Sequence, residues 1–162
     1  MRRIDAEFGL LGTRLGYLLR RVDILGMELL SEMLGELGLT PARATALTFI
    51  SLHEGCDQTE LGSALGINRA SAMATVNALV ALGAVERHPG RTRRSNALRL
   101  TGVGTRLYGE IEQITGEHDT HFFAGLSEAE RSQLEALLRK IRAHATSTND
   151  RPQRPATLRR VK

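Results

Sequence analysis

The chain lacks the residues on which several classes of protein depend. Its 162 residues include one cysteine and no tryptophan, and aromatic residues make up 4% of the total. A single cysteine excludes an internal disulfide. No apolar run approaches the roughly 18 residues that a membrane-spanning helix requires. The chain must therefore fold around an ordinary hydrophobic core, for which its apolar content of 41% is sufficient.

Sequence motifs of enzymes are also missing. The chain has no glycine-rich phosphate loop, no cysteine pair and no nucleophile-elbow sequence. We therefore expect no catalytic residues, no cofactor and no resident metal. The first thirty residues contain no uncharged apolar stretch of the kind found in signal peptides, so we expect a cytoplasmic protein with no membrane partner.

The most informative pattern lies in residues 59–100 and the residues just before them. Asp57 can cap a first helix, with a glutamate three residues on that can complete a capping box. Gly66 can end that helix in the left-handed conformation, and Asn68 can cap a second helix that runs to about Leu82. Two helices joined by so short a turn predict a helix-turn-helix, whose second helix can enter the major groove of DNA.

The second of these helices has an apolar stripe and a small, polar face. The apolar positions recur at intervals of three and four, and they are Ala72, Val76, Leu79 and Val80. The predicted outward positions are Arg69, Ser71, Ala74, Asn77 and Ala78. Small side chains let a helix approach base edges, while asparagine and arginine can pair with adenine and guanine respectively. A solvated face of an ordinary helix would have the same composition, so this feature alone leaves both interpretations open.

A basic hairpin is predicted directly after the second helix. Extended segments at Ala84–His88 and Asn96–Leu100 flank a turn with proline and glycine at its base and arginines at its tip. From Arg87 to Arg106 there are six basic residues and no acidic one. Arginines bind phosphates and can reach into a narrow minor groove, so the pattern predicts a winged helix. The predicted DNA-binding residues are Asn68, Arg69, Ser71, Ala74, Asn77, Arg87, Arg91, Arg93 and Arg94.

Long helical patterns flank this region on both sides. Residues 8–37 carry two apolar stripes, although their glycines leave open a break within the helix. Thr40 can cap a helix that runs to about Glu54, Thr101 can cap one that continues toward Phe122, and Ser127 can open the last one. A helix that is apolar on two sides needs two partners, so we expect one side to pack against a second copy of the chain.

The run from Leu37 to Tyr108 resembles the multiple-antibiotic-resistance regulator (MarR) family, and the flanking helices extend this resemblance to about residues 8–145. The residues that carry it, in order, are Gly38-Leu39-Thr40, Leu65-Gly66-Ile67, Gly83 before Val85-Glu86-Arg87, Arg93-Arg94 and Leu100-Thr101. Two positions differ from the family pattern. Thr92 replaces the usual aspartate before the two wing arginines, and Ala74 replaces a basic residue common in the recognition helix.

The resemblance implies a mainly α fold with a small β-hairpin wing, in which a winged helix-turn-helix is flanked by dimerisation helices. It implies dimerisation helices at 1–37 and 101–147 and a DNA-binding lobe at 38–100, called the lobe below. We expect residues 148–162 to be a disordered basic tail. The implied function is that of a homodimeric transcriptional repressor on a pseudo-palindromic operator in double-stranded DNA. A small, aromatic acid-like effector would release it, bound by Tyr17, Arg20 and His53.

Three alternatives remain open at this stage. His118 and His121 lie three residues apart and could bind a metal on one helix face, which would make the protein a metal-responsive regulator. Cys56 could sense oxidants, although its place before a helix cap favours simple packing. The third alternative is a helical module that binds an acidic protein through its wing instead of DNA.

Overall fold

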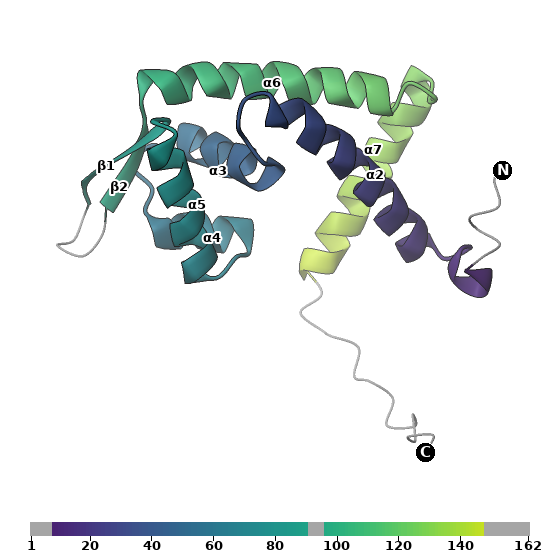
Figure 1. Cartoon of the computed structure of the whole chain (residues 1–162). Helices are drawn as coiled ribbons and strands as arrows, with labels where there is room; N and C mark the ends of the chain where they lie inside the picture. Colours follow the sequence, from purple (N-terminus) through teal and green to yellow (C-terminus); the bar gives the residue numbers. More distant parts are fainter. Residues whose placement is uncertain (1–7, 91–95, 148–162) are drawn as a thin grey trace, which may run out of the picture. The chain divides into compact units, whose positions relative to one another are not determined.

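The computed structural model describes residues 8–90 and 96–147, which form a mainly helical chain with one small hairpin (Figure 1). In chain order the elements are a 3-10 helix η1 (Gly9–Leu11), α2 (Leu15–Gly35), α3 (Pro41–Leu52), α4 (Gln58–Leu65), α5 (Arg69–Ala81), β1 (Val85–Pro89), β2 (Asn96–Leu100), α6 (Gly102–Phe122) and α7 (Glu128–Ser147). The predicted fold class is thus confirmed. Packing divides the chain into two units, one ending at Phe122 and the other containing α7.

The predicted helix caps are present. The Asp57 carboxylate accepts from the backbone N–H groups of Thr59 and Glu60 at 2.8 and 2.9 Å, and Glu60 completes the capping box at the start of α4. Gly66 ends α4 with φ of 64°, a left-handed value that glycine adopts at little cost. Thr40 and Asn68 cap α3 and α5. These local bonds explain why two short helices begin and end where they do.

The core of the lobe brings together α3, α4, α5 and the hairpin. Its fully buried side chains include Leu47, Ile50, Leu61, Val76, Leu79 and Leu98. Burying one such side chain contributes about 1.5–3 kcal/mol. In this core α5 packs through the predicted stripe, with Ala72, Val76 and Leu79 buried, which leaves its opposite face outward.

The hairpin is antiparallel, with Val85 opposite Leu100 and Arg87 opposite Leu98. The outer edge of β2 does not stay open, because Leu98 exchanges backbone hydrogen bonds with the segment after α3. Gly55 donates to the Leu98 carbonyl at 2.9 Å, and the Leu98 N–H donates to Cys56 at 2.8 Å. The base of the wing is therefore fixed to the rest of the lobe through β2.

The start of α6 lies directly against the lobe. The Thr101 hydroxyl donates to the Gly83 carbonyl at 2.6 Å and accepts from the Gly104 N–H at 3.1 Å. A β-carbon added to Gly104 would lie 2.0 Å from the Ala84 carbonyl oxygen, and a side-chain carbon cannot come so close to a backbone atom. Glycine at this position is what allows α6 to approach so closely.

The helix predicted over residues 8–37 is interrupted, which is the alternative that its glycines had left open. The 3-10 turn η1 comes first, and α2 begins only at Leu15. Of the residues in α2, only Gly26 and Leu34 are buried. Leu15, Leu18, Leu19, Val22, Leu25 and Met27 are exposed. Within the unit that ends at Phe122, the first half of α2 therefore leaves much of its apolar surface exposed.

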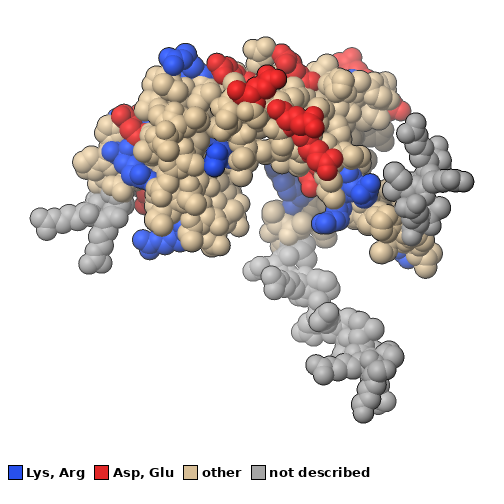
Figure 2. All heavy atoms as spheres, viewed as in Figure 1, with Lys and Arg blue, Asp and Glu red and all other residues tan. Residues whose placement is uncertain are grey.

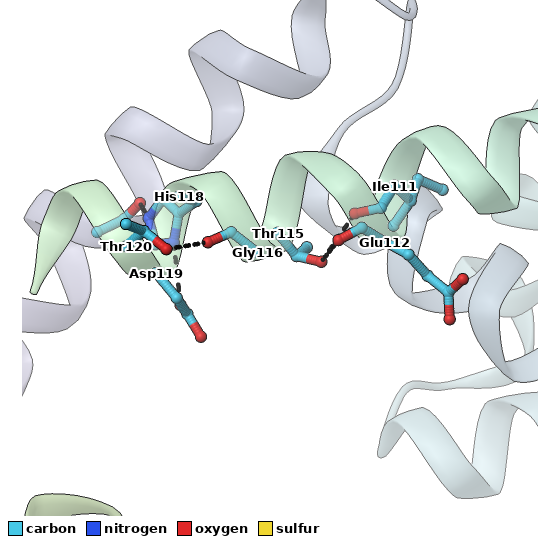
Figure 3. Close-up of polar contacts among 8 residues, drawn as sticks. Ile111, Glu112, Thr115, Gly116, His118, Asp119 and Thr120 are labelled. Carbon is cyan, nitrogen blue, oxygen red and sulfur yellow. Dashed lines mark hydrogen bonds and ion pairs between the residues drawn. The ribbon is translucent and has the colours of Figure 1, made fainter. Parts of the chain in front are cut away.

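Helix α6 meets α2 at a buried histidine. The His118 Nε2 atom lies 3.0 Å from the Gly26 carbonyl oxygen, and its ring stacks on Phe122 at a centroid distance of 5.5 Å. Figure 3 shows the ring directed from α6 toward the neighbouring helix, with Asp119 on its other side. The phenyl ring of Phe122 would lie 3.3 Å from a β-carbon at Gly26. Small size at Gly26 thus makes room for the aromatic pair.

The second unit contains α7, which opens with the predicted capping box. Glu130 accepts from the backbone N–H of Ser127 at 2.8 Å, and the Ser127 hydroxyl lies 3.4 Å from the Glu130 N–H. No residue of α7 is buried. Leu137, Leu138 and Ile141 are among its exposed side chains.

Candidate nucleic-acid interface

The outward face of α5 carries the helix residues predicted to contact DNA. Asn68, Arg69, Ser71, Ala74 and Asn77 are all exposed, while Ala78 is half-buried. Met73 also lies exposed on α5, and sequence reasoning did not select it. The exposed residues along α5 are short or flexible, so the helix backbone can come close to a flat or grooved partner.

Asn68 is already engaged at the start of α5. Its Oδ1 atom accepts from the Ser71 backbone N–H at 2.9 Å, which is the N-cap bond. This bond holds the amide oxygen, so the amide nitrogen and the exposed Ser71 hydroxyl are the groups left to meet a ligand. The first turn of α5 also presents its N-terminal N–H groups, which favour an anion such as a phosphate.

Arg87 is not directed only outward, as a phosphate-binding residue would be. Because side chains alternate along a strand, Arg87 shares the face of β1 that holds buried Val85. Its Nη2 atom donates to Oδ1 of Asn77 at 2.5 Å, across ten residues of sequence. Two predicted DNA-binding residues therefore contact each other and connect α5 to the wing.

The other face of the hairpin carries a separate set of charges. Glu86 lies 2.7 Å from Nε2 of His88, and Arg99 lies 3.6 Å from Glu54. The strand register places Glu86 opposite Arg99. This face thus combines both signs of charge, and it points away from the face that holds Arg87.

Three predicted wing residues, Arg91, Arg93 and Arg94, lie outside the described residues, as does Thr92. The predicted tail at 148–162 lies outside them too. In the surface view of Figure 2, acidic side chains gather over α6 and α2, and arginines appear over the hairpin side of the lobe. Among the exposed acidic residues of these two helices are Glu28, Glu32, Glu110, Glu112 and Glu117.

The three predicted effector-binding residues have separate surroundings. Tyr17 is half-buried near the start of α2, and its ring lies 5.4 Å from that of Phe8. Arg20 is exposed on the same helix. His53 follows α3, stacks on Phe49 at 4.2 Å and lies 3.0 Å from the Phe49 carbonyl oxygen. Within the described part of one chain, no hydrogen bond, ion pair or ring contact joins any two of the three.

The metal and redox alternatives find no supporting geometry. Within residues 8–90 and 96–147, no three His, Cys, Asp or Glu side chains gather closely enough to hold a metal ion. His118 is buried against α2, whereas His121 is exposed. Cys56 is buried, and this burial, followed by the nearby carboxylates of Glu60 and Asp57, raises the pKa of its thiol to about 11. A neutral thiol is a poor nucleophile toward oxidants.

A capped helix-turn-helix followed by a hairpin packed on its second helix defines a winged-helix DNA-binding regulator. Residues 37–95 match the model of the MarR family. A protein assigned to transcriptional regulation of the hcr operon in Thauera aromatica is 32% identical over 135 residues, which is 82% of this chain and 81% of that protein. The chain belongs to the MarR family of transcriptional regulators, whose fold and relatives are not those of enzymes.

Solved structures agree with this assignment. The transcriptional repressor CouR bound to a 23-mer DNA duplex has a TM-score of 0.76 at 29% identity, with 82% of this chain and 95% of that chain covered. A MarR family protein of Mycobacterium tuberculosis in complex with salicylic acid has a TM-score of 0.66 at 27% identity, with 80% and 96% covered. Within the described residues, no helix is long and apolar enough to span a membrane.

Proposed function

We propose that this protein is a homodimeric repressor that binds a pseudo-palindromic operator through α5 and the wing and acts in the cytoplasm. The observation that carries the proposal is the exposed face of α5, which holds Asn68, Arg69, Ser71, Ala74 and Asn77 on a helix anchored by the lobe. CouR, a repressor of similar fold, has been solved on a DNA duplex. In this chain, the exposed face of α5 has the size and the donors needed to enter a major groove.

Binding to the gene's own upstream intergenic DNA tests this proposal. A twofold dimer should protect an imperfect palindrome whose half-sites are about one helical turn, roughly 10 base pairs, apart. The measurement is a gel shift in competition with random duplex, followed by footprinting. Equal affinity for both duplexes would instead favour the wing as a general anion-binding surface, of the kind that could contact an acidic protein.

The wing arginines should provide phosphate contacts rather than sequence preference. Replacing Arg93 and Arg94 by alanine removes four cations from a dimer. If all four contact phosphate, the slope of log K against log salt should become shallower by roughly 3–4, from about 0.9 per phosphate. Affinity for operator and random DNA should fall together. A folded double variant with an unchanged slope would remove the wing from the proposed interface.

Dimer formation is supported by the apolar surface that each unit leaves exposed. Leu15 is 77% exposed and Leu25 51% exposed on α2, and Ile141 is 53% exposed on α7. Exposed apolar side chains gathered on one helix usually mark an interaction site. A second copy of the chain would bury them. Light scattering at micromolar concentration should give the mass of a dimer, and a stable full-length monomer would contradict the proposal.

The effector is proposed to be a small aromatic carboxylate. The cation of Arg20 suits a carboxylate, and Tyr17 and His53 supply ring surfaces. The relative from Mycobacterium tuberculosis was solved with salicylic acid. A panel of phenolic acids should raise the melting temperature and weaken the gel shift, and Arg20→Ala should abolish both responses. A panel that leaves melting and DNA binding unchanged would argue against this ligand class.

A further inference from the structure

The contact between Arg87 and Asn77 joins two elements that are expected to touch DNA separately. Arg87 belongs to β1, Asn77 belongs to α5, and both side chains are exposed. The Nη2 atom of Arg87 lies 2.5 Å from Oδ1 of Asn77. The donor is charged, and hydrogen bonds with one ionised partner are stronger than those between neutral groups.

The chemistry of the two groups fixes which way the amide points. A guanidinium group only donates hydrogen bonds, so the atom of Asn77 that it meets must be the oxygen. The amide nitrogen, with its two N–H donors, is then directed away from the wing. If Arg87 were absent, the amide could turn over and present either its oxygen or its nitrogen to a partner.

We propose that Arg87 is a positioning residue that makes Asn77 read DNA as a hydrogen-bond donor, and that this excludes cytosine at the base that Asn77 meets. The proposal rests on the proposed function, namely that α5 enters the major groove. Guanine, adenine and thymine each offer an acceptor there, whereas cytosine offers only its N4 donor. The Asn77 N–H groups, held in place by Arg87, would then face the N4 amino group of cytosine and find no acceptor.

The different degrees of change in base preference expected from variants at Asn77 and Arg87 make the test specific. Asn77→Asp keeps an oxygen for Arg87 but replaces the N–H donors by an acceptor. It should weaken overall binding and reverse the preference, so that cytosine becomes the favoured base. Arg87→Ala should reduce the discrimination against cytosine by about tenfold, within the range for one well-placed base contact. Arg87→Lys, which keeps a donor and a charge, should restore part of it.

Arg99→Ala is the matched control. Arg99 is also an exposed hairpin arginine, but it pairs with Glu54 at 3.6 Å on the opposite face. Its removal takes away the same charge without freeing Asn77. Loss of one positive charge should affect affinity similarly in both arginine variants, while only Arg87→Ala should alter base preference.

The experiment uses the full chain and the footprinted upstream duplex, with all four bases tested in turn at each position of both half-sites. Competition binding is measured for wild type and for the single and double variants, each checked for folding by circular dichroism. The variants are Asn77→Asp, Asn77→Ala, Arg87→Ala, Arg87→Lys, Arg99→Ala and the Arg87→Ala/Asn77→Ala pair. In the Asn77→Ala background, Arg87→Ala should change no base preference, because its effect acts through that amide. Preference unaltered by Arg87→Ala and Asn77→Asp, with wild type binding its operator normally, would overturn the inference. A wild type that binds no DNA specifically would instead overturn the proposed function.

Discussion

The lobe and the first long helix differ in how completely they bury their apolar side chains. In the lobe, Leu47, Leu61 and Leu79 are fully buried within one chain. On α2, Leu15, Leu25 and several neighbours are exposed, although the helix has as regular an apolar pattern. A periodic stripe therefore marks surface that must be covered, without saying whether the cover comes from the same chain. The apolar core of the lobe is buried within a single copy, whereas the apolar stripe at the start of α2 is exposed in one.

The largest effect on stability should come from adding a side chain where α6 contacts the lobe. In Gly104→Ala the new β-carbon would lie 2.0 Å from the Ala84 carbonyl oxygen, and hydrogen bonds from Thr101 to the Gly83 and Ala84 carbonyl oxygens hold the two segments together. We expect a loss of about 4 kcal/mol or more in the free energy of unfolding, a size that only a few mechanisms produce. Urea unfolding followed by circular dichroism measures it.

Gly109→Ala is the matched control on the same helix. A β-carbon at Gly109 would meet no atom within 4 Å. Alanine is favoured over glycine inside a helix, so this variant should gain up to about 1 kcal/mol. Similar losses in the two variants would mean that the close approach at Gly104 does not matter for stability.

The next effect contrasts a buried leucine of the lobe with an exposed one of α2. Leu79→Ala should cost about 3 kcal/mol at any protein concentration, because its cavity lies inside one chain. Leu25→Ala should leave the stability of a single chain nearly unchanged and raise the dissociation constant of the proposed dimer by about tenfold. Sedimentation equilibrium and unfolding at two concentrations separate these two responses. A Leu25→Ala variant that associates as tightly as wild type would place the dimer contact elsewhere.

Removing a helix cap should cost less stability than removing a buried leucine, and the cost should differ between the two units. Asp57 accepts two backbone bonds at 2.8 and 2.9 Å, so Asp57→Ala should cost about 1–2 kcal/mol. The Ser127 hydroxyl is 3.4 Å from its backbone partner, and Ser127→Ala should cost about 0.5 kcal/mol. Thermal unfolding measures both, and a larger loss at Ser127 would reverse the comparison.

The cap of α7 also predicts how the helix content of α7 changes with pH. Hydrogen bonds from the Ser127 side chain and then its backbone lower the pKa of Glu130. A carboxyl group with a lowered folded-state pKa stabilises above its unfolded pKa, and this contribution is lost as pH falls through the folded value. The helix content of α7 should therefore decrease on acidification in that range, less so in Glu130→Gln. A Glu130→Gln variant with the wild-type pH profile would contradict this.

The smallest effect on stability, but a clear one on reactivity, concerns Cys56. With a thiol pKa of about 11, the thiolate is a small minority at pH 8. Labelling by iodoacetamide should be slower in the native protein than in urea by about hundredfold, and it should accelerate as pH rises. Mass spectrometry gives both rates. Rapid native labelling would revive a redox role for this residue.

Sequence patterns predicted the elements of the lobe well because their signals are local. The bonds of Asp57, Thr40 and Asn68 each span two or three residues, so the residue types alone indicate them. The same holds for Gly66, whose left-handed conformation follows from the short turn after α4. The start of α2 was harder, because the glycines of residues 8–37 reduce helix propensity without fixing where the helix begins.

The contact between Arg87 and Asn77 could not be predicted in this way. It depends on how β1 packs across α5, and a basic residue in a wing is ordinarily expected to point to phosphate. One signal was nonetheless present, since Val85 is apolar and alternation along the strand places Arg87 on the same, inward face. The proposed contacts of Arg93 and Arg94 and the effector-binding residues remain predictions.

The tight junction at Gly104 has a mechanical consequence for the unit that ends at Phe122. Because Thr101 ties the start of α6 to Gly83, this helix cannot swing without carrying the lobe with it. A helix of 21 residues is a lever about 30 Å long, so a sideways shift of about 2 Å at its far end turns it by about 4°. That far end is held by α2 through His118 and the Gly26 carbonyl (Figure 3). We therefore expect a displacement of α2 at Gly26 to reach the lobe partly through α6, and to tilt α5, the helix proposed to enter a major groove.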